Sequence, residues 1–360
     1  MTRAAYTRET LAQRVVFGDG AVAQLGAEVE RLGGRRVLLV ATPGCAPLVA
    51  AAADGLGRLL ADRFEQAAMH TPVAVTASAQ RVAIARRADT VVSVGGGSAV
   101  GLGKALALRE RLLHVAVPTT YAGSEATPVL GETRDGRKTT RRDPALVPRT
   151  VVYDPLLTHG LPAGLSGTSG LNAIAHAVEA LYAAEGDPLT DVQARAGIAA
   201  MAEGLRGIFS QGDIAAARRA ALAGAWHCGS VLATAPMGLH HQLCHVLGGS
   251  FDLPHSETHA VLLPHVAAFN APAAPAALQA VAETLGAPPD HRAAASALLA
   301  LAAAVDAPAS LRQLGFAGTP EQVQQVVAQV LERPYPNPRT PDADGLRTLL
   351  RAATEGEEPR

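Results

Sequence analysis

Polar side chains recur one helical turn apart in two stretches of this sequence. In SGLNAIAHAVEAL, Asn172 and His176 are four residues apart. In GLHHQLCHVLGGSFDLPH, His241 and His245 have the same spacing, and His255 follows ten residues later. Residues four apart share one face of a helix, and metal ions often use that spacing. The pattern indicates a metal site, except that an amide stands at Asn172, where a cation would favour a carboxylate.

The histidines are concentrated around the second stretch. Seven of the twelve lie between residues 227 and 265, and His259 follows His255 at helical spacing. A single helical histidine is usually a hydrogen-bonded core residue, but two spaced pairs in one segment favour a functional site. Carboxylates near these histidines are few. Glu179, three residues after His176, could face solvent instead.

A glycine-rich turn joins a strand-like run to a helix-like run in VVSVGGGSAVGLGKALAL. Gly95, Gly96 and Gly97 have no Cβ, so their N–H groups can approach a phosphate closely. The helix expected to begin near Ser98 directs its positive dipole end to the same place. The spacing is neither GxGxxG nor GxxxxGK[ST]. Because three consecutive glycines exceed what a tight turn needs, we expect phosphate binding here.

Two further segments follow predicted strands. Thr119, Thr120 and Ser124, in VPTTYAGSEATP, come at the carboxyl end of a strand, where open α/β sheets bind ligands. Ala41, in VATPG, takes a place where an acidic residue would select NAD over NADP. With no charge there, both NADH and NADPH are expected as cofactors.

The elements that must position these residues change character near residue 158. Strand-like runs alternate with helix-like runs before it, which predicts an α/β dinucleotide-binding domain over residues 1–157 with a parallel sheet covered on both faces. Ala- and Leu-rich segments of helical period predict an all-helical catalytic domain over residues 158–354. Residues 271–310 are expected to form packed short helices rather than a linker. Residues 355–360 are expected to be a disordered tail.

Composition narrows the class of protein. The chain is 48% hydrophobic and 18% charged with a net charge of -1, which gives no reason to expect a nucleic-acid or membrane partner. Its apolar runs are too short to span a bilayer, and its first residues lack the apolar core of a signal peptide. The three scattered cysteines make no disulfide framework and no CxxC motif. A cytoplasmic protein is expected.

Together these segments resemble the iron-containing alcohol dehydrogenase superfamily, related in fold to dehydroquinate synthase. The resemblance covers nearly the whole chain and rests on GGGS after a strand, TTYAGSE, DPLLTHGLP and the two histidine stretches. It implies an α/β N-terminal nucleotide-binding domain plus an all-α C-terminal domain, with the active site between them. In metal-dependent members an Asp and three His hold the ion, and the corresponding residues here are Asn172, His176, His241 and His255. His245 matches a histidine beside the nicotinamide and the substrate.

Two departures resemble the maleylacetate reductase branch of that superfamily. Asn172 replaces the ligand Asp, and Gly101 replaces the Asp of GGGSxxDxxK. TTYAGSEATP, TSGLNAIAHAVEALYA and LPHSETHAVLLPH also match the branch. The branch implies NAD(P)H-dependent reduction of the C=C bond of maleylacetate to 3-oxoadipate in aromatic-compound degradation, by a homodimer and without metal. Lys138 matches a lysine near the cofactor in relatives, although a solvated hairpin lysine is an equal alternative.

Physical reasoning gives the amide a role. A neutral amide cannot replace the attraction between an ion and a carboxylate, so a divalent site is weakened, although three histidines alone can still bind Zn²⁺. Without metal, charged imidazoles can accept a small dicarboxylate substrate, and the Asn172 amide can donate a hydrogen bond to a substrate oxygen.

Roles for the other candidates follow from the same reasoning. His245 is the expected catalytic residue, with His241, His176 and His255 holding the substrate. Tyr121 either contacts the nicotinamide region or packs beside the loop. Lys104 is expected to face solvent or to cap the phosphate loop.

Three other functions remain open at this stage. A metal-dependent Fe or Zn alcohol dehydrogenase would lose activity to a chelator. A biosynthetic lyase or cyclase of the same fold would turn over without net NADH consumption. A non-catalytic nucleotide-binding protein would not need the full set of histidines.

Overall fold

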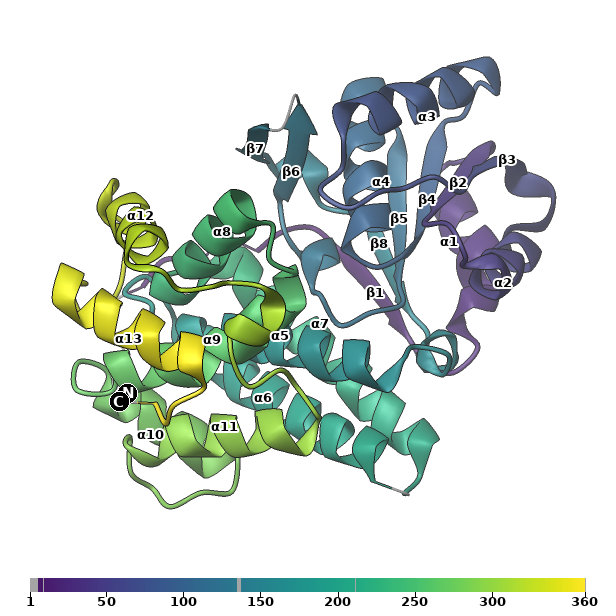
Figure 1. Ribbon diagram of the computed structural model, residues 1–360. Coiled ribbons are helices and arrows are strands. Elements are labelled where there is room, and N and C mark those ends of the chain that lie inside the picture. The colour runs from purple at the N-terminus through teal and green to yellow at the C-terminus, as the bar shows by residue number, and fades with distance from the viewer. Residues whose placement is uncertain (1–5, 9, 135–136, 211, 360) are drawn as a thin grey trace. The chain divides into compact units, whose positions relative to one another are not determined.

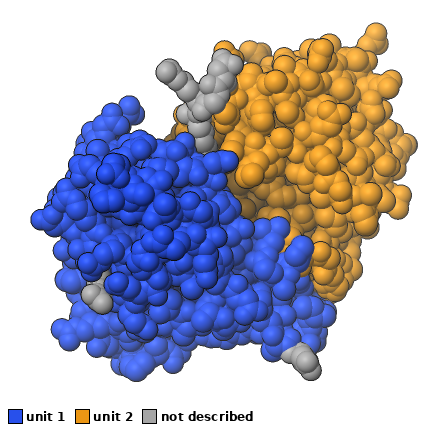
Figure 2. Space-filling model, in the orientation of Figure 1, with its two compact units in different colours: residues 1–9, 162–360 blue, residues 10–161 orange. Residues whose placement is uncertain are grey.

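The computed structural model describes residues 6–8, 10–134, 137–210 and 212–359, with only the backbone described at Arg137 and Lys138 (Figure 1). The chain divides into two compact units (Figure 2). Residues 10–161 form one, called here the α/β unit. The described residues from 162 onward, together with residues 6–8, form the other, called here the helical unit.

The α/β unit is built on a six-stranded parallel sheet with the order β1-β8-β5-β4-β2-β3. Its strands are β1 (Arg14–Phe17), β2 (Val37–Ala41), β3 (Leu60–Phe64), β4 (Thr90–Gly95), β5 (Leu113–Pro118) and β8 (Thr150–Tyr153). An antiparallel hairpin, β6 (Val129–Arg134) and β7 (Arg137–Arg142), stands apart from the sheet. The unit's α-helices are α1 (Leu25–Arg31), α2 (Ala46–Leu56), α3 (Val73–Ala85) and α4 (Gly97–Glu110).

Alternate residues of the central strands enter two separate cores. Val37, Leu39 and Ala41 of β2 pack with side chains of α1 and α2. Leu38 and Val40, which point the other way, pack with side chains of α3 and α4. Strands buried on both faces are near-continuous apolar runs, as these are. The expected α/β class, with a parallel sheet covered on both faces, is confirmed.

The strands β3, β6 and β7 are difficult to predict from the sequence, because none of them is a continuous apolar run. β3 lies at the edge of the sheet, and its sequence LADRF carries Asp62 and Arg63 in place of an apolar run. Edge strands tolerate such charges, which protect them from further pairing. The hairpin strands β6 and β7 are likewise rich in polar residues.

Lys104 is fully buried within α4, contrary to the expectation that it faces solvent or caps the glycine turn. Its ammonium group donates hydrogen bonds to the backbone oxygens of Ser124 (2.6 Å), Thr127 (2.7 Å) and Val129 (2.8 Å), and Oγ1 of Thr127 lies 3.0 Å away. Burial lowers the pKa of Lys104 to about 7, and the charge of Glu125 partly offsets this. Because backbone oxygens can only accept, the charged form suits the site best. Lys104 thus ties α4 to the segment that carries Ser124.

The helical unit contains α5 (Ala163–Tyr182), α6 (Pro188–Phe209), α7 (Ile214–Thr234), α8 (Leu239–Phe251), α9 (His255–Asn270), α10 (Pro275–Thr284), α11 (Ala293–Ala304), α12 (Pro320–Leu331) and α13 (Ala343–Glu355). No strand occurs among the described residues of this unit. Asp187, Asp213 and Asp342 cap α6, α7 and α13 by accepting backbone N–H bonds, which explains where these helices begin. Residues 271–310 form α10 and α11, as expected. Among the described helices, none is long and apolar enough to cross a membrane.

Both ends of the chain differ from expectation. Residues 6–8 belong to the helical unit, where Arg8 donates to both carboxylate oxygens of Asp187 at 2.7 and 2.9 Å. The tail expected to be disordered from Glu355 instead completes α13. Gly356 takes the left-handed conformation (φ 72°), and the N–H of Glu357 reaches the carbonyl of Ala352. This is a regular glycine C-cap, which the sequence EGEE conceals among charges.

The Lys104 contacts predict a large stability effect. Substituting Lys104→Met leaves buried carbonyl groups without a donor, so the free energy of unfolding should fall by about 3 kcal/mol. Urea denaturation measures this. Arg58→Met, at an exposed arginine in the same unit, is the control and should change stability by less than about 0.5 kcal/mol. Equal effects of the two substitutions would contradict the assigned role.

Candidate active site

Three helices of the helical unit carry the polar side chains singled out in the sequence, and α9 packs against both α5 and α8 (Figure 1). The buried polar residues that they bring together are Asn172, His176 and Glu179 from α5, His240 and His241 from α8, and His259 from α9. The spacing of 172, 176 and 179 follows the helical period, so the three α5 residues share one face. The structure therefore brings the expected Asn172, His176 and His241 together, among the buried side chains of α5 and α8.

The imidazole rings lie close enough to form one cluster. The rings of His176 and His241 stack with centroids 5.0 Å apart. The ring of His259 lies 4.9 Å from that of His241 and 4.4 Å from that of His255. It also lies 6.5 Å from the ring of His176. His259, which was not among the expected site residues, is thus a neighbour of His176, His241 and His255, three of the four histidines that were expected to line the site.

Glu179 is the buried carboxylate of this cluster, although the sequence allowed it to face solvent. It accepts hydrogen bonds from Nδ1 of His241 (2.6 Å) and from the backbone N–H groups of Gly238 (3.0 Å) and His240 (2.9 Å). Burial raises its pKa, but the charge and hydrogen bond of His241, the charge of His240 and the Gly238 N–H together hold it below its usual value. An ionised carboxylate here fixes the His241 tautomer, with Nδ1 protonated and Nε2 on the opposite side of the ring.

His240 and His259 form a second pair of neighbouring histidines in the cluster. Nε2 of His240 and Nδ1 of His259 are 2.8 Å apart, a hydrogen-bond distance, and Sγ of Cys244 lies 3.8 Å from Nε2 of His240. Burial lowers the pKa of His240 to about 3. Burial, together with the charges of the surrounding histidines, also holds the pKa values of His259 and His176 well below their usual range. These imidazoles are therefore neutral at pH 7.

The remaining two candidate histidines are the exposed ones of the cluster, and their position is called here the outer level. His245 and His255 are exposed, and their rings are nearly parallel (11°) with centroids 6.4 Å apart. The ring of His245 is 6.3 Å from that of His241, one turn along α8. His245, the expected catalytic residue, is thus exposed, whereas His241 is buried.

Unpartnered polar atoms mark where a ligand could bind. Among the described residues, Oδ1 of Asn172, Nδ1 of His176, and Nε2 of both His241 and His259 are buried without a hydrogen-bond partner. Most buried polar groups in proteins are paired, so four unpaired atoms on neighbouring side chains indicate a place for a polar ligand. This group of four residues is called the inner site below.

The donor set at the family's metal position lacks the carboxylate ligand that a divalent ion favours. Asn172 brings no charge, and the Glu179 carboxylate is already engaged by His241, by two backbone N–H groups and by the Tyr182 hydroxyl at 3.5 Å. Among the described residues, the histidines that match the family's ligands do not gather their ligand atoms within 4.8 Å of one another, whereas His240, Cys244 and His259 do. The 2.8 Å between the nitrogens of His240 and His259 is a hydrogen bond, because two nitrogens on one tetrahedral Zn²⁺ lie about 3.3 Å apart.

The glycine turn of the α/β unit fits a phosphate. Gly95 ends β4 with a φ of 139°, a conformation that favours glycine, and a Cβ on Gly96 would lie 3.0 Å from the Thr120 side chain. α4 begins at Gly97, one residue before Ser98, and no described side chain caps it. A Cβ on Gly97 would meet no described atom within 4 Å. The first turn of α4 can therefore present N–H groups to a phosphate.

The other expected cofactor residues are only partly placed as predicted. Thr119 is buried, with its N–H bonded to the carbonyl of Gly95, and Ser124 opens a 3₁₀ turn, Ser124–Ala126. Tyr121 is fully buried, which favours the packing interpretation. Lys138 lies in β7, but its side chain is outside what the structure describes.

Ala41 does not occupy the place assigned to it. It is the last residue of β2, and its side chain lies in the core with Val94 and Val117. The residue that follows the strand is Thr42. Thr42, Pro43 and Gly44 carry no charge either, so the prediction that both NADH and NADPH are accepted is unchanged.

Gly101 shows why the family's aspartate is missing from this chain. A Cβ at Gly101 would lie 2.4 Å from Oγ1 of Thr71. Thr71 has a left-handed backbone (φ 45°), and its carbonyl accepts a hydrogen bond from the N–H of Thr133 in β6. The space of an aspartate side chain is thus taken by Thr71.

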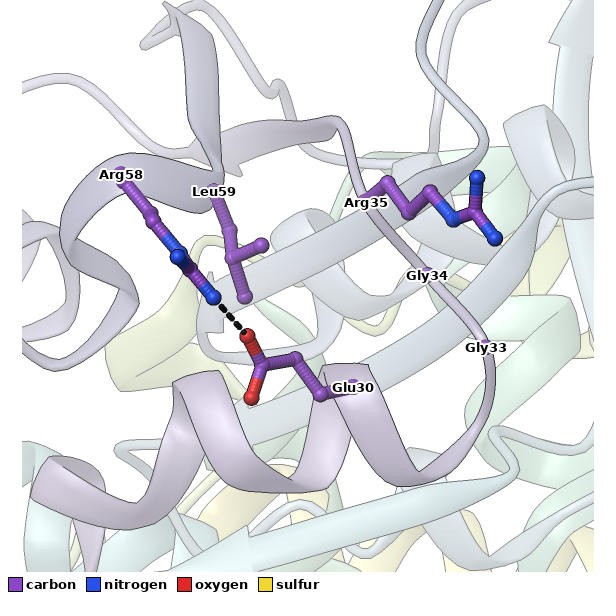
Figure 3. A pocket seen from close by; sticks show the side chains of 6 residues that line it. All are labelled: Glu30, Gly33, Gly34, Arg35, Arg58 and Leu59. Atoms are coloured by element: carbon purple, nitrogen blue, oxygen red, sulfur yellow. Dashed lines mark hydrogen bonds and ion pairs between the residues drawn. The ribbon is translucent and has the colours of Figure 1, made fainter.

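A surface pocket of about 510 Å³ in the α/β unit lies away from this chemistry (Figure 3). An exposed ion pair of 2.9 Å joins two of its lining residues, Arg58 and Glu30. Its residues 33–35 precede β2, whereas Gly95–Gly97 follow the neighbouring parallel strand β4. The pocket is therefore at the amino ends of the strands and the glycine turn at their carboxyl ends. The pocket is not a candidate for the cofactor site.

The Glu179 network predicts an effect of charge removal. In Glu179→Gln the side chain keeps its size, but His241 loses its ionic partner, so the free energy of unfolding should fall by about 3 kcal/mol. Urea denaturation measures this. Glu283→Gln, at a partly exposed glutamate 3.9 Å from Arg195, is the control and should cost less than about 0.5 kcal/mol. A Glu179→Gln protein as stable as the control would show that the carboxylate is not ionised.

The neutral buried histidines predict acid sensitivity. The unfolded chain binds protons at these side chains below about pH 6.5, while the folded chain does not, so the free energy of unfolding must fall as pH drops. His265, buried on α9 outside the cluster, contributes because burial lowers its pKa to about 4. Substituting His265→Leu should reduce the stability loss between pH 6 and pH 5 by about 1 kcal/mol. His159→Gln, at an exposed ring, should leave that loss unchanged.

Comparison with known proteins places these features in a family. Residues 12–155 match the family described as iron-containing alcohol dehydrogenase, and residues 166–354 match the C-terminal part of the Fe-containing alcohol dehydrogenase family. The maleylacetate reductase of Rhizobium sp. (strain MTP-10005) is 47% identical over 350 residues, covering 97% of this chain and 98% of that protein. Maleylacetate reductase 1 of Cupriavidus pinatubonensis (strain JMP 134 / LMG 1197) is 44% identical over 357 residues, covering 98% of each chain.

A solved structure gives the same result. The crystal structure of maleylacetate reductase from Agrobacterium tumefaciens has a TM-score of 0.94 and 45% identity, covering 99% of this chain and 100% of that one. The resemblance and the fold class expected from the sequence are thereby confirmed, as is the assignment to the oxidoreductases. The chain belongs to the iron-containing alcohol dehydrogenase family.

Proposed function

We propose that this protein reduces the C=C bond of maleylacetate to 3-oxoadipate with NADH or NADPH, in aromatic-compound degradation and without a metal ion. The observation that carries the metal-free part is the inner site itself, which has Asn172 in place of a charged ligand and Glu179 committed to hydrogen bonds. The relatives at 44–47% identity supply the substrate and the reaction.

The histidine cluster suits a small dicarboxylate. A dianion that loses water needs cations or hydrogen-bond donors in exchange. His245 and His255, exposed with their rings nearly parallel, can take up protons and receive a carboxylate at the outer level. Asn172 and the inner imidazoles then face the uncharged middle of the substrate, where the double bond and the ketone lie.

The α/β unit supplies the place for the cofactor. Gly95–Gly97 and the uncapped start of α4 would hold its phosphates, and Lys104 holds the neighbouring segment of Ser124 in place. The uncharged Thr42 leaves room for either NADH or NADPH. A homodimer is part of the same proposal and rests on the family resemblance alone, whereas a cytoplasmic location rests on the scattered cysteines and the absence of a signal-peptide core in the first residues.

A bound nicotinamide supplies a hydride to the substrate carbon that is β to the ketone. Negative charge then develops on the ketone oxygen, and the α carbon must gain one proton to complete the reduction. Hydrogen-bond donors set around that oxygen in advance lower the barrier. The Asn172 amide is one such donor and adds no negative charge.

His241 is better placed than His245 to give the proton. Its Nδ1–H is held by Glu179, so its unpartnered Nε2 is the atom free to exchange a proton with the substrate. In the form that donates, Nε2 carries the transferred proton, and the Nδ1–H bond to the Glu179 carboxylate orients the ring, as the third member of a catalytic triad does. His245 is exposed one turn further along α8, and we assign it to substrate binding.

The experiment is NADH oxidation by purified protein with maleylacetate, before and after exhaustive chelation. Turnover unchanged by chelation is expected. Asn172→Asp restores the family's ligand and should lower kcat/KM about tenfold or more, because a carboxylate repels the dianion. The same variant should bind Zn²⁺ more tightly than the unaltered protein.

Two other outcomes would reject parts of the proposal. Activity lost to the chelator and restored by Fe²⁺ or Zn²⁺ would show a metal enzyme despite Asn172. No turnover of maleylacetate, with NADH still bound, would reject the substrate.

A further inference from the structure

We propose that His259 is a catalytic residue of this site, whose Nε2–H donates a hydrogen bond to the ketone oxygen of the substrate, and that His240 holds it in the tautomer that does so. The inference rests on the proposed function and adds a residue and a role to it. The expected ligand positions of the family did not include either histidine.

The position of His259 is the first support. Its ring lies 4.4 Å from that of His255, 4.9 Å from that of His241 and 6.5 Å from that of His176. It is therefore next to every histidine that matches a metal ligand of the family. The side chain is fully buried, and its Nε2 has no hydrogen-bond partner among the described residues.

The contact with His240 makes the two nitrogens of His259 distinct. Nδ1 of His259 lies 2.8 Å from Nε2 of His240, so one of the two nitrogens carries the shared proton. If His240 donates, His259 carries its own proton on Nε2. If His259 donates, its Nε2 has only a lone pair, and the buried Nδ1–H of His240 is left without an acceptor among the described residues.

A bound substrate oxygen would favour one of these two directions of the hydrogen bond between His240 and His259. An oxygen beside Nε2 of His259 needs a proton from it, which only the first arrangement supplies. With the ketone bound, that arrangement leaves only one unpaired atom, the acceptor Nδ1 of His240. The other arrangement leaves an unpaired buried donor, and unpaired buried donors are rarer in proteins than unpaired acceptors. Binding of the ketone therefore favours the His240 to His259 direction of donation.

A neutral imidazole is suited to this role. The ring of His259 is fully buried and its Nδ1 is held 2.8 Å from Nε2 of His240, so a proton on its Nε2 is held in a fixed direction. A neutral imidazole N–H can stabilise charge that develops on a carbonyl oxygen without transferring its proton, as happens in triosephosphate isomerase. The inner site thereby gains a fixed donor where metal-dependent members of the family would use an ion.

Cys244 suggests a rival interpretation of the same residues as a metal site. With His240 and His259 it forms a buried group of N and S ligands. The 2.8 Å hydrogen bond between the two histidines already satisfies the nitrogens that an ion would need. The test below includes a metal measurement so that this rival is an outcome.

The experiment compares two ligands that differ only at the ketone. 3-Oxoadipate carries the ketone and adipate does not, and the affinity of the NAD⁺-loaded protein for each is measured by calorimetry. His259→Asn keeps a polar atom near Nδ1 but removes the inner donor, whereas His259→Gln places an amide N–H near the Nε2 position. We expect His259→Asn to weaken 3-oxoadipate binding about tenfold and to leave adipate unchanged. His259→Gln should recover part of the loss.

Turnover gives the second readout. Loss of one preset donor should lower the kcat of His259→Asn about 100-fold with little change in KM. His265→Asn, at a buried histidine on the same helix outside the cluster, is the matched control and should keep both kcat and the ligand preference. Thermal unfolding and NADH binding show whether each variant is folded.

Three outcomes would overturn the inference. Equal weakening of both ligands by His259→Asn would show a general packing role. Unchanged binding and kcat would show that Nε2 does not meet the ketone. A metal bound in the unaltered protein and lost in His259→Asn would favour the rival ion site. If the unaltered protein neither binds 3-oxoadipate nor turns over maleylacetate, the proposed function fails instead.

Discussion

The buried carboxylate of Glu179 is the interaction on which the rest of the helical unit's chemistry depends. It accepts the N–H groups of Gly238 and His240 at the start of α8 and the Nδ1–H of His241 one residue further on. One side chain therefore sets both the position of the helix and the tautomer of the histidine that α8 presents. Such a charge is costly to bury and stable only with several donors, so the arrangement leaves little freedom to α5 and α8.

The α/β unit uses a buried charge of the opposite sign in the same way. Lys104 holds the segment from Ser124 to Val129 through backbone oxygens, beside the loop that carries Thr119 and Thr120. Both charges are on helices, and Glu179 shares the face of α5 that carries Asn172 and His176. The buried charges of Lys104 and Glu179, which have several hydrogen-bond partners, thus position the surrounding segments. The polar groups without partners are the ones available to bind a ligand.

Much of this could be predicted from the sequence, and what could not has physical causes. Strong periodicity predicted the sheet and the helices, and spacing predicted the pairing of Asn172 with His176. Burial was not predictable from residue type, so Glu179 was allowed to face solvent and Lys104 was expected to face solvent or to cap the phosphate loop. The 172, 176, 179 spacing was the available signal for Glu179. Ala41 was misplaced because the end of a buried strand is uncertain by a residue, and β3 was missed because edge strands can be charged.

We propose that imidazoles and an amide, with no metal ion, surround the substrate's ketone. A crystal structure of the protein with NAD⁺ and 3-oxoadipate tests this proposal most directly, with anomalous diffraction data to detect transition metals. We expect the ketone oxygen within hydrogen-bond distance of Nε2 of His259 and of the Asn172 amide, with His241 facing the adjacent carbon and no anomalous peak. An ion bound by His176, His241 and His255, with the ketone oxygen as its ligand, would contradict it.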